Sequence, residues 1–341
     1  MGSDRGAERW GLPDQAKPTS DKDRQRRAVE RKDRTRKMGD RFAGKVIVIT
    51  GAGSGLGREC ALQWSSEGAA VVVTDINEAR ALAVKEEIEK NNGRAVSLKV
   101  DVCEESEVEQ AVREAVDRYG RIDIMFANAG RSIPGGPAFE DVTQEQWDDI
   151  INLVFRGVFF AGKHACRAMK EQGGGGNIVV TASAAGLNAY PVGFGPYAAG
   201  KSGLVGLVKS MAVEWGKYGI RVNALAPTHG MSINFALPLD APVLNMSYEE
   251  YAFKNSDEPW GPHKFVGPLK VGRPPSIRDN AAVATFLASD DSAYMSGLII
   301  PSCDGGNFAM TSIPFPDRWT MEEMVAPALD ETSVLRRVAG R

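Results

Sequence analysis

Three side chains in one stretch of the sequence have the chemistry of a proton-transfer site. The stretch "TASAAGLNAYPVGFGPYAAGK", residues 181–201, holds Ser183, Tyr197 and Lys201. Tyr197 and Lys201 are four residues apart, so on a helix they would lie on one face. A free tyrosine has a pKa of about 10 and is a poor base, but a nearby ammonium stabilises the phenolate and lowers that pKa. The stretch alone leaves two interpretations open, because a surface tyrosine and lysine on an ordinary helix have the same spacing.

The hydrophobic pattern predicts the scaffold that must position these side chains. Apolar, often β-branched runs predict buried strands at 45–50, 69–75, 95–102, 122–130, 176–183, 220–227 and 298–306. Helical patterns lie between them, up to about residue 67, at 77–93 and 106–120, from about residue 143, and at 197–217 and 278–289. This alternation predicts an α/β fold, a doubly wound parallel sheet of the Rossmann type in a single domain.

Both ends of the chain differ from this pattern. Residues 1–41 are rich in Lys and Arg with almost no apolar residues, which predicts a flexible basic N-terminal extension. Interspersed acids argue against a nucleic-acid or membrane patch there. We therefore expect a domain at 42–310, a C-terminal extension at 311–341, and no nucleic-acid or membrane partner.

The composition narrows the class of protein further. The net charge is −3, and the four cysteines are far apart with no CxxC pair. The three histidines have no metal-ligand spacing, so no metal is expected. No apolar run approaches the roughly 20 residues that span a bilayer, and no secretory signal opens the chain. We expect a cytoplasmic protein.

A Gly-rich stretch, "TGAGSGLG" at 50–57, lies between the first predicted strand and helix. Gly51 and Gly55 permit a tight turn, and Gly57 permits close helix packing. The amino end of the helix then offers free N–H groups and a positive dipole end to a pyrophosphate. A tight turn without any ligand is the alternative.

Asp75 ends the second predicted strand, eighteen residues after Gly57. A carboxylate there can accept hydrogen bonds from two ribose hydroxyls and would repel a 2′-phosphate. Neither Ser54 nor Ile76 supplies a positive charge, so NAD is favoured over NADP. A plain helix N-cap at Asp75 is compatible with this role. Asp101, at the end of the third strand, is expected to touch the adenine.

Taken together, these motifs resemble the short-chain dehydrogenase/reductase family. The resemblance rests on TGxxxGxG, on Asp75, on "NAG" at 128–130 and on Tyr197-Ala-Ala-Gly-Lys201, and it extends over about residues 42–308. It implies an NAD(H)-dependent oxidoreductase that interconverts a secondary alcohol and a ketone. Tyr197 would accept the alcohol proton while hydride leaves the same carbon for NAD⁺, with Ser183 holding the substrate oxygen and Lys201 contacting the nicotinamide ribose.

The resemblance also implies a set of cofactor contacts along the chain. Asn128 would lie beside the adenosine half, and Ser232 stands where many members have a threonine that contacts the cofactor. Pro227 is followed by Thr228, whereas members usually have Pro-Gly. The full expected set is Gly51, Ser54, Gly55, Leu56, Gly57, Asp75, Ile76, Asp101, Val102, Asn128, Ala129, Gly130, Tyr197, Lys201, Pro227, Thr228 and Ser232.

One position departs from the family pattern. Members have an asparagine seven residues after a tryptophan and three before a glycine; here Trp147 and Gly157 fix that register, and the residue is Val154. Asn152 is two residues earlier, about 200° around a regular helix, so it would face elsewhere unless the helix is distorted. Three interpretations are open: an enzyme with another proton relay, a slow enzyme of narrow substrate use, or an NAD(H)-binding sensor or scaffold without turnover. The first is favoured because the serine, tyrosine and lysine persist.

A long segment after the sixth predicted strand, residues 231–270, is rich in aromatic residues and prolines and predicts a lid. We expect an apolar pocket for a bulky cyclic or aromatic alcohol or ketone, as in members that act on cyclic alcohols; a mini-core of the lid or a subunit contact is the alternative. The expected substrate contacts are Ser183, Tyr190, Phe194, His229, Phe235 and Trp260. The resemblance further implies a homotetramer or homodimer, with the C-terminal extension packing on a neighbouring subunit.

Overall fold

The computed structural model describes residues 39–131, 136–188, 193–236, 241–254 and 273–302 of the 341-residue chain. Nearly all of the predicted N-terminal extension and the whole C-terminal extension lie outside these residues. So do parts of the predicted lid, residues 237–240 and 255–272.

Within the described residues, seven strands form one sheet in the order β3-β2-β1-β4-β5-β6-β7, and all neighbours are parallel. The strands are β1 (Val46–Thr50), β2 (Ala70–Asp75), β3 (Arg94–Lys99), β4 (Ile124–Ala127), β5 (Gly176–Thr181), β6 (Ile220–Pro227) and β7 (Ile299–Ser302). The predicted doubly wound parallel sheet is confirmed. Because β1 and β2 are buried on both faces, their residues are almost all apolar.

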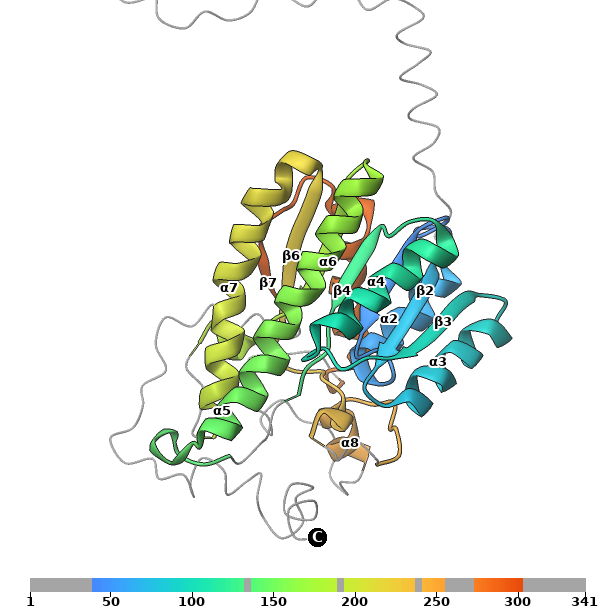
Figure 1. Ribbon diagram of the computed structural model, residues 1–341. Coiled ribbons are helices and arrows are strands. Elements are labelled where there is room, and N and C mark those ends of the chain that lie inside the picture. Colours follow the sequence, from blue (N-terminus) through green and yellow to red (C-terminus); the bar gives the residue numbers. More distant parts are fainter. Residues whose placement is uncertain (1–38, 132–135, 189–192, 237–240, 255–272, 303–341) are drawn as a thin grey trace, which may run out of the picture. The chain divides into compact units, whose positions relative to one another are not determined.

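Helices cover both faces of the sheet. One face carries α4 (Glu105–Tyr119), α6 (Gly157–Gln172) and α7 (Gly195–Trp215), the helices nearest the viewer in Figure 1. The other carries α2 (Gly55–Ser66), α3 (Glu78–Lys90) and α9 (Ile277–Ala288). Along β1, Val46 and Val48 belong to the first core, and Ile47 and Ile49 to the second, as a period of two requires.

Short elements complete the described chain. They are η1 (Phe139–Asp141), α5 (Gln144–Ile151), η2 (Asn152–Arg156), η3 (Ala184–Gly186), η4 (Gly216–Tyr218), η5 (Ile233–Ala236), α8 (Tyr248–Lys254) and η7 (Asp290–Ser292). Capping boxes begin two helices: Thr143 pairs with Gln146 at α5, and Ser276 with Asp279 at α9.

The prediction of a single long helix from residue 143 is wrong in one respect. The structure has two helices there, α5 and α6, which are separated by a π-helical turn, η2. Tight packing on both sides accompanies this turn. A Cβ on Gly157 would lie 2.9 Å from Cγ2 of Val102, and a Cβ on Gly200 of α7 would lie 2.5 Å from Cγ2 of Val154. Periodicity could not reveal the extra residue, since a π-turn is a local insertion into an otherwise helical pattern.

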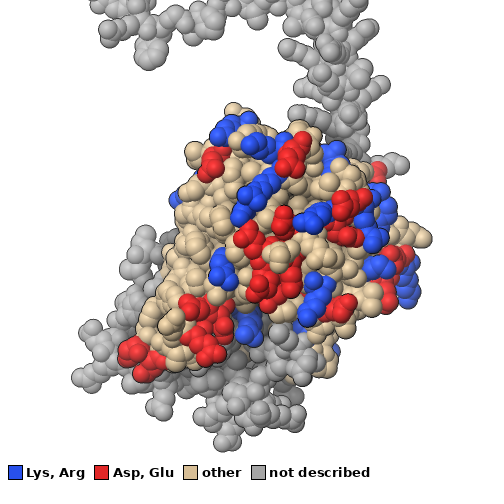
Figure 2. Space-filling view, viewed as in Figure 1, with Lys and Arg blue, Asp and Glu red and all other residues tan. Residues whose placement is uncertain are grey.

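The strand order reverses direction between β1 and β4, which makes the carboxyl edge of these two strands a topological switch point. The Gly-rich turn follows β1 and the "NAG" stretch follows β4, so both lie at that edge. On the face shown in Figure 2, acidic and basic side chains are interspersed, without a continuous basic surface.

Candidate active site

The Gly-rich turn between β1 and α2 has the form of a phosphate cradle. Gly51 and Gly55 have φ angles of +63° and +56°, in the left-handed region that favours glycine. A Cβ on Gly57 would lie 2.3 Å from the carbonyl oxygen of Gly51. The N-cap residue Ser54 makes no capping hydrogen bond with its side chain, and the first turn of α2 has no acidic residue. The first backbone amides of α2 are therefore left available to a ligand.

Asn128 holds this turn in place from β4. Its Nδ2 donates to the carbonyl oxygens of Thr50 and Gly51 at 3.1 and 3.3 Å, and its Oδ1 accepts from the Thr181 hydroxyl at 3.0 Å. The Thr50 hydroxyl in turn accepts from the backbone N–H groups of Asn128 and Ala129, each at 3.0 Å. This network joins the ends of β1, β4 and β5, so Asn128 is a positioning residue.

Asp75 lies at the next corner of the same edge. Its Oδ2 accepts from the Gly53 N–H at 2.9 Å and its Oδ1 from the Asn77 N–H at 3.0 Å. Burial raises the pKa of the Asp75 carboxyl, opposed by these two amides and by the nearby Arg80. The helix N-cap is Asn77, which accepts from the Arg80 N–H, so Asp75 is not the cap of α3.

A cleft of about 450 Å³ connects these groups. Twelve of the expected cofactor residues line it: Gly51, Ser54, Gly55, Leu56, Asp75, Ile76, Asp101, Val102, Asn128, Ala129, Gly130 and Ser232. Arg80, Asn152 and Arg156 also line it, and the sequence analysis did not select them as cofactor residues. Arg80 could have been suspected from its place in the first turn of the helix that follows Asp75.

Tyr197 and Lys201 lie at the nearby end of β5, both on α7 and both buried. The Lys201 Nζ donates to the carbonyl oxygen of Thr181 at 2.6 Å and lies 5.7 Å from the centre of the Tyr197 ring. Burial lowers the pKa of Lys201 to about 7. Ser183 begins η3, and its Oγ accepts from the Ala185 N–H at 3.1 Å. The carboxyl end of β5 therefore positions both the lysine and the serine.

Val154 is fully buried, and like Lys201 it lies close to Gly130. A Cβ on Gly130 would lie 3.7 Å from the Lys201 Nζ and 3.8 Å from Cγ1 of Val154, so both side chains lie close to Gly130. The helix is distorted here, as a role for Asn152 would require, but Asn152 lines the cleft that holds the Gly-rich turn and Asp75. An apolar side chain therefore stands beside the Lys201 amine.

The chain after β6 returns across the cleft. A Cβ on Gly55 would lie 2.8 Å from the Cβ of Ser232, so this segment touches the Gly-rich turn. Glu249 of α8 is buried; its Oε2 accepts from the Gly230 N–H at 3.2 Å, and its Oε1 lies 3.2 Å from Nδ1 of His229. His229 thus contacts the predicted lid through a carboxylate.

Comparison with known proteins places this geometry in a family. A family model described as "short chain dehydrogenase" matches residues 45–232. Levodione reductase of Leifsonia aquatica is 36% identical over 274 residues, which cover 79% of this chain and 96% of that protein. This chain belongs to the short-chain dehydrogenase/reductase family.

Solved structures also resemble this short-chain dehydrogenase/reductase over most of its length. Carveol dehydrogenase from Mycobacterium avium, in complex with NAD, matches with a TM-score of 0.65 at 31% identity, over 77% of this chain and 97% of that one. A 7α-hydroxysteroid dehydrogenase, complexed with NADH and 7-oxo glycochenodeoxycholic acid, matches with a TM-score of 0.64 at 29% identity, over 79% and 96%. The family and its relatives make this chain an NAD-type oxidoreductase.

Several predicted contacts of this family member fall outside the described residues. Tyr190 and Trp260 are among them, as is the side chain of Phe235, whose backbone belongs to η5. Phe194 is described: it precedes α7, and its ring meets that of Tyr197 edge to face, with 6.4 Å between centroids. Of the expected substrate residues, Ser183, Phe194 and His229 can be placed.

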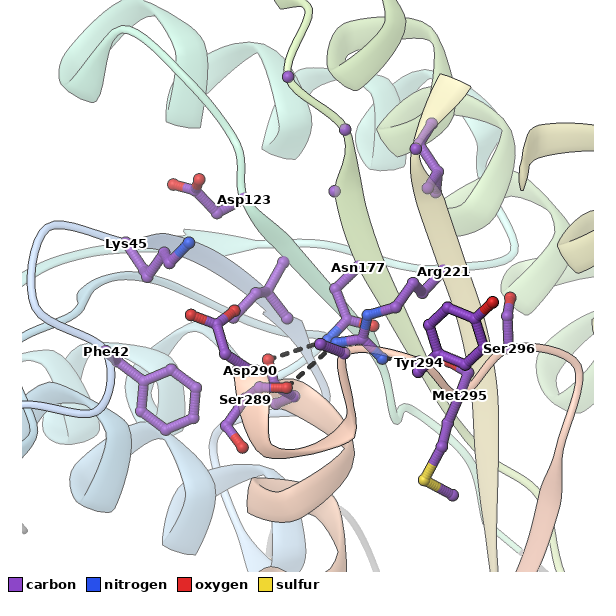
Figure 3. Close-up of a pocket in the computed structure, with 18 of the residues that line it drawn as sticks. Phe42, Lys45, Asp123, Asn177, Arg221, Ser289, Asp290, Tyr294, Met295 and Ser296 are labelled. Atoms are coloured by element: carbon purple, nitrogen blue, oxygen red, sulfur yellow. Dashed lines mark hydrogen bonds between the residues drawn. The ribbon is translucent and has the colours of Figure 1, made fainter. Parts of the chain in front are cut away.

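A second cavity, of about 520 Å³, lies at the opposite edge, where the strands begin (Figure 3). Two arginines that line this cavity make hydrogen bonds or ion pairs with other residues of the protein. Arg221 donates to the carbonyl oxygens of Leu287, Ser289 and Met295, and Arg121 pairs with Asp123 at 2.7 Å. Ser183, Tyr197 and Lys201 line neither this cavity nor the cleft at the switch point, but the cleft is lined by the Gly-rich turn and Asp75.

No group of three or more His, Cys, Asp or Glu side chains in the described part of this oxidoreductase could hold a metal ion. None of the described helices combines the length and apolar character needed to cross a membrane.

Proposed function

We propose that this chain is an NAD(H)-dependent enzyme that interconverts a secondary alcohol and a ketone, with Tyr197 as the general acid and base. The observation that carries the proposal is the buried Tyr197–Lys201 pair at the carboxyl end of β5, beside a Gly-rich cradle at the end of β1. The relatives named as reductases and dehydrogenases support it and do not favour the alternative of a sensor without turnover.

The residues at the cleft fit a dinucleotide. The turn needs glycine at positions 51, 53 and 57, since a Cβ at any of them would come within 3.0 Å of neighbouring protein atoms. The uncapped start of α2 would hold the diphosphate with its backbone amides, and Asp75 would accept from the ribose hydroxyls. A 2′-phosphate would meet the Asp75 carboxylate, which supports NAD over NADP.

Bound NAD⁺ would take hydride from the carbinol carbon of the alcohol, or NADH would return it to the ketone. In oxidation the Tyr197 phenolate takes the hydroxyl proton as the carbon–oxygen bond becomes a double bond. In reduction the Tyr197 O–H gives that proton back. The Ser183 Oγ accepts one hydrogen bond from Ala185, and its own hydrogen is free to reach the substrate oxygen.

Lys201 supplies the charge that makes the phenol acidic. With its pKa lowered to about 7, the amine exchanges protons readily near neutral pH. Val154 offers no hydrogen bond on that side, so the proton relay of this chain runs without the family's asparagine. We infer that the ammonium is held through Thr181 and, when cofactor is bound, through the nicotinamide ribose.

The substrate we propose is bulky and carries a ring. The 7-oxo glycochenodeoxycholic acid bound by the 7α-hydroxysteroid dehydrogenase is a molecule of this type. In this chain α8 is docked by Glu249 next to His229, which supports a lid over the substrate.

We further propose that the protein forms a homodimer or homotetramer and resides in the cytoplasm. Val213 on α7 is 85% exposed and Phe159 on α6 is 41% exposed, which supports burial of these helices in a homodimer or homotetramer. The free thiols of Cys60, Cys103 and Cys166 support a reducing, cytoplasmic setting. Analytical ultracentrifugation would test the first point: a monomer at micromolar concentration would contradict it.

The test of the reaction is a screen of cyclic secondary alcohols with NAD⁺, following NADH absorbance, beside a direct measurement of NAD⁺ binding. Tyr197→Phe should abolish turnover and leave NAD⁺ affinity within about twofold, because only the hydroxyl is removed. A variant that still turns over at the wild-type rate would remove Tyr197 from its role. Tight NAD⁺ binding with no turnover on a broad panel would instead favour the sensor.

A further inference from the structure

Asn280 is a polar side chain on an otherwise apolar face of α9. It is fully buried, and the positions one and two helical turns away on that face, Ile277, Ala284 and Leu287, belong to the core on this side of the sheet. An amide is costly to bury unless its hydrogen-bonding groups are paired. An apolar side chain would pack here without that cost, so the reason for an amide lies in what it binds.

The amide of Asn280 is paired at both ends. Its Nδ2 donates to the backbone carbonyl oxygen of His229 at 2.8 Å and lies 4.0 Å from Sδ of Met231. Its Oδ1 accepts from the hydroxyl of Ser302 at 2.7 Å. The backbone carbonyl of Ser302 in turn accepts from the N–H of Thr228 at 3.1 Å. One side chain of α9 therefore ties the end of β7 to the segment that follows β6.

That segment, residues 228–232, borders the cofactor cleft. Met231 and Ser232 line the cleft, and a Cβ on Gly55 would lie 2.8 Å from the Cβ of Ser232. The segment begins at the carboxyl end of β6, beside the carboxyl end of β5. Because the turn after β1 would hold the diphosphate and the corner after β2 the adenosine ribose, the nicotinamide half would extend toward the ends of β5 and β6.

We propose that Asn280 is a positioning residue for the cofactor, which holds residues 228–232 in the shape that the nicotinamide half of the dinucleotide requires. The proposal rests on the proposed function, because it takes the cleft to be the NAD(H) site. Asn280 acts through the backbone carbonyl of His229, so its effect does not depend on the side chain of that residue.

The helix that carries Asn280 is a firm support. From β5, Nδ2 of Asn177 donates to the carbonyl oxygens of Leu287 and Ala288 at 2.8 and 2.9 Å. From α2, Nε1 of Trp64 donates to the hydroxyl of Thr285 at 2.8 Å. A contact with α9 therefore fastens residues 228–232 to a part of the molecule that two other elements hold in place.

The predicted lid makes a second set of contacts with the segment. The N–H of Gly230 donates to Oε2 of Glu249 at 3.2 Å, and the carbonyl oxygen of Met231 accepts from the N–H of Tyr248 at 2.9 Å. Both partners belong to α8, so these bonds join the segment to the lid. The bond from Asn280 joins it to the core of the sheet instead.

Loss of the Asn280 amide should reduce cofactor affinity. Binding would then have to order residues 228–232, and the measured affinity falls in proportion to the fraction of protein that already has the binding shape. We expect the dissociation constant of NAD⁺ to rise about tenfold in Asn280→Leu, the effect of one buried hydrogen bond. AMP, which matches only the adenosine half, should bind within about twofold of its wild-type affinity.

The test is calorimetry on the full chain with NAD⁺ and AMP, without substrate. Asn280→Leu should weaken NAD⁺ binding and spare AMP binding, and Asn280→Ala provides the same comparison if the leucine variant does not fold. Wild-type NAD⁺ affinity in the folded variant would overturn the proposal. An equal loss of NAD⁺ and AMP affinity would overturn the assignment to the nicotinamide half.

A matched control separates positioning from general destabilisation. Thr285→Val removes a buried hydroxyl from the same helix, where it bonds to Trp64 and Gln63 of α2. This variant should unfold at a lower urea concentration and keep its NAD⁺ affinity within about twofold. If Thr285→Val loses as much NAD⁺ affinity as Asn280→Leu, the effect is one of stability, and the positioning role is refuted.

Amide hydrogen exchange gives a readout that stability alone would not move. Bound NAD⁺ should slow exchange in residues 228–234 more in Asn280→Leu than in the wild type, because the cofactor then has to order the segment. Equal slowing in the two proteins would contradict the proposal.

Failure of the proposed function would give a different result. Wild-type protein that binds NAD⁺ but catalyses nothing would refute the proposed reaction and leave the comparison of Asn280 variants measurable. Wild-type protein that binds neither NAD⁺ nor AMP would overturn both proposals.

Discussion

The Nζ of Lys201 donates to the carbonyl oxygen of Thr181 at 2.6 Å, and both this Nζ and the side chain of Val154 lie close to Gly130. A lysine on α7 is thus tied to the last residue of β5, two positions before Ser183. The bond fixes the amine near the Tyr197 ring, and burial lowers the pKa of the amine to about 7. The charge of Lys201 therefore depends on the few groups packed around it.

Lys201→Met should abolish turnover and also change how stability depends on pH. In the unfolded chain the lysine titrates near its ordinary value of 10.5, and in the folded chain near 7. Between these values the unfolded state binds more protons, so this group makes wild-type stability rise with pH from about 7 toward 10.5. The penalty below pH 7 is a few kcal/mol, of the order of 1 kcal/mol per pKa unit. The free energy of unfolding, measured with urea at neutral and alkaline pH, should rise less with pH in Lys201→Met than in the wild type. An equal rise in the two proteins would contradict a lysine amine whose pKa is lowered by burial.

Val154→Asn should move the pH profile of the reaction. An amide oxygen beside the Lys201 Nζ would accept a hydrogen bond from the ammonium and raise the pKa of this lysine above about 7. Activity that needs the ammonium is lost as pH rises through that value, so the alkaline limb of kcat/KM should move to higher pH. Val154→Ala, which adds no acceptor, serves as the control. If the alkaline limb of kcat/KM does not move in Val154→Asn, the titration that it reports does not belong to Lys201.

Asn128→Ala should weaken the Gly-rich turn. The amide makes two bonds to backbone carbonyls and accepts one from Thr181, and their loss leaves buried groups unpaired at a cost of about 1–3 kcal/mol. Stability in urea should fall by that amount and NAD⁺ affinity should fall with it. Asn91→Ala, at the exposed end of α3, should change neither. Wild-type NAD⁺ affinity in Asn128→Ala would show that the turn holds its shape without this clamp.

Glu249→Ala should release α8. Glu249 is the buried side chain that binds Gly230 and contacts His229, so its loss removes both attachments. We expect faster amide hydrogen exchange in residues 244–254 and little change in β1 or β4, since the sheet does not depend on α8. Glu249→Gln keeps one acceptor, so its exchange rates in residues 244–254 should lie between those of the wild type and those of Glu249→Ala. Equal exchange rates in the wild type and both variants would show that α8 is held by other contacts.

The preference for NAD should depend on pH through Asp75. Burial raises the pKa of this carboxyl, so it takes up a proton as the pH falls through that raised value. The neutral form no longer repels a 2′-phosphate, and the ratio of NAD⁺ to NADP⁺ affinity should decline with it. Because the phosphate also titrates, near pH 6, the informative quantity is the part of the pH dependence that is absent from Asp75→Asn. Identical pH profiles for the two proteins would contradict this account.

Local pattern was enough to predict most of the scaffold. Buried strands are recognised as continuous apolar runs, and the spacing of Tyr197 and Lys201 is a property of any helix. The turn at Gly51 and Gly55 needs positive φ angles, which is a local requirement as well. The π-turn at η2 was not predicted, because a local insertion does not change the helical pattern and the tight packing that accompanies it involves α7 and the loop after β3.

The α/β alternation, the Gly-rich turn, Asp75 and the helical spacing of the tyrosine and lysine could all be predicted from the residues alone, because each depends on neighbours a few residues away. Two relationships became visible only in the folded chain: Val154 and Lys201 both lie close to Gly130, and Asn128 clamps the ends of three strands together. Those relationships join segments up to dozens of residues apart, and the register of the sheet and the packing of helices on it determine which side chains meet.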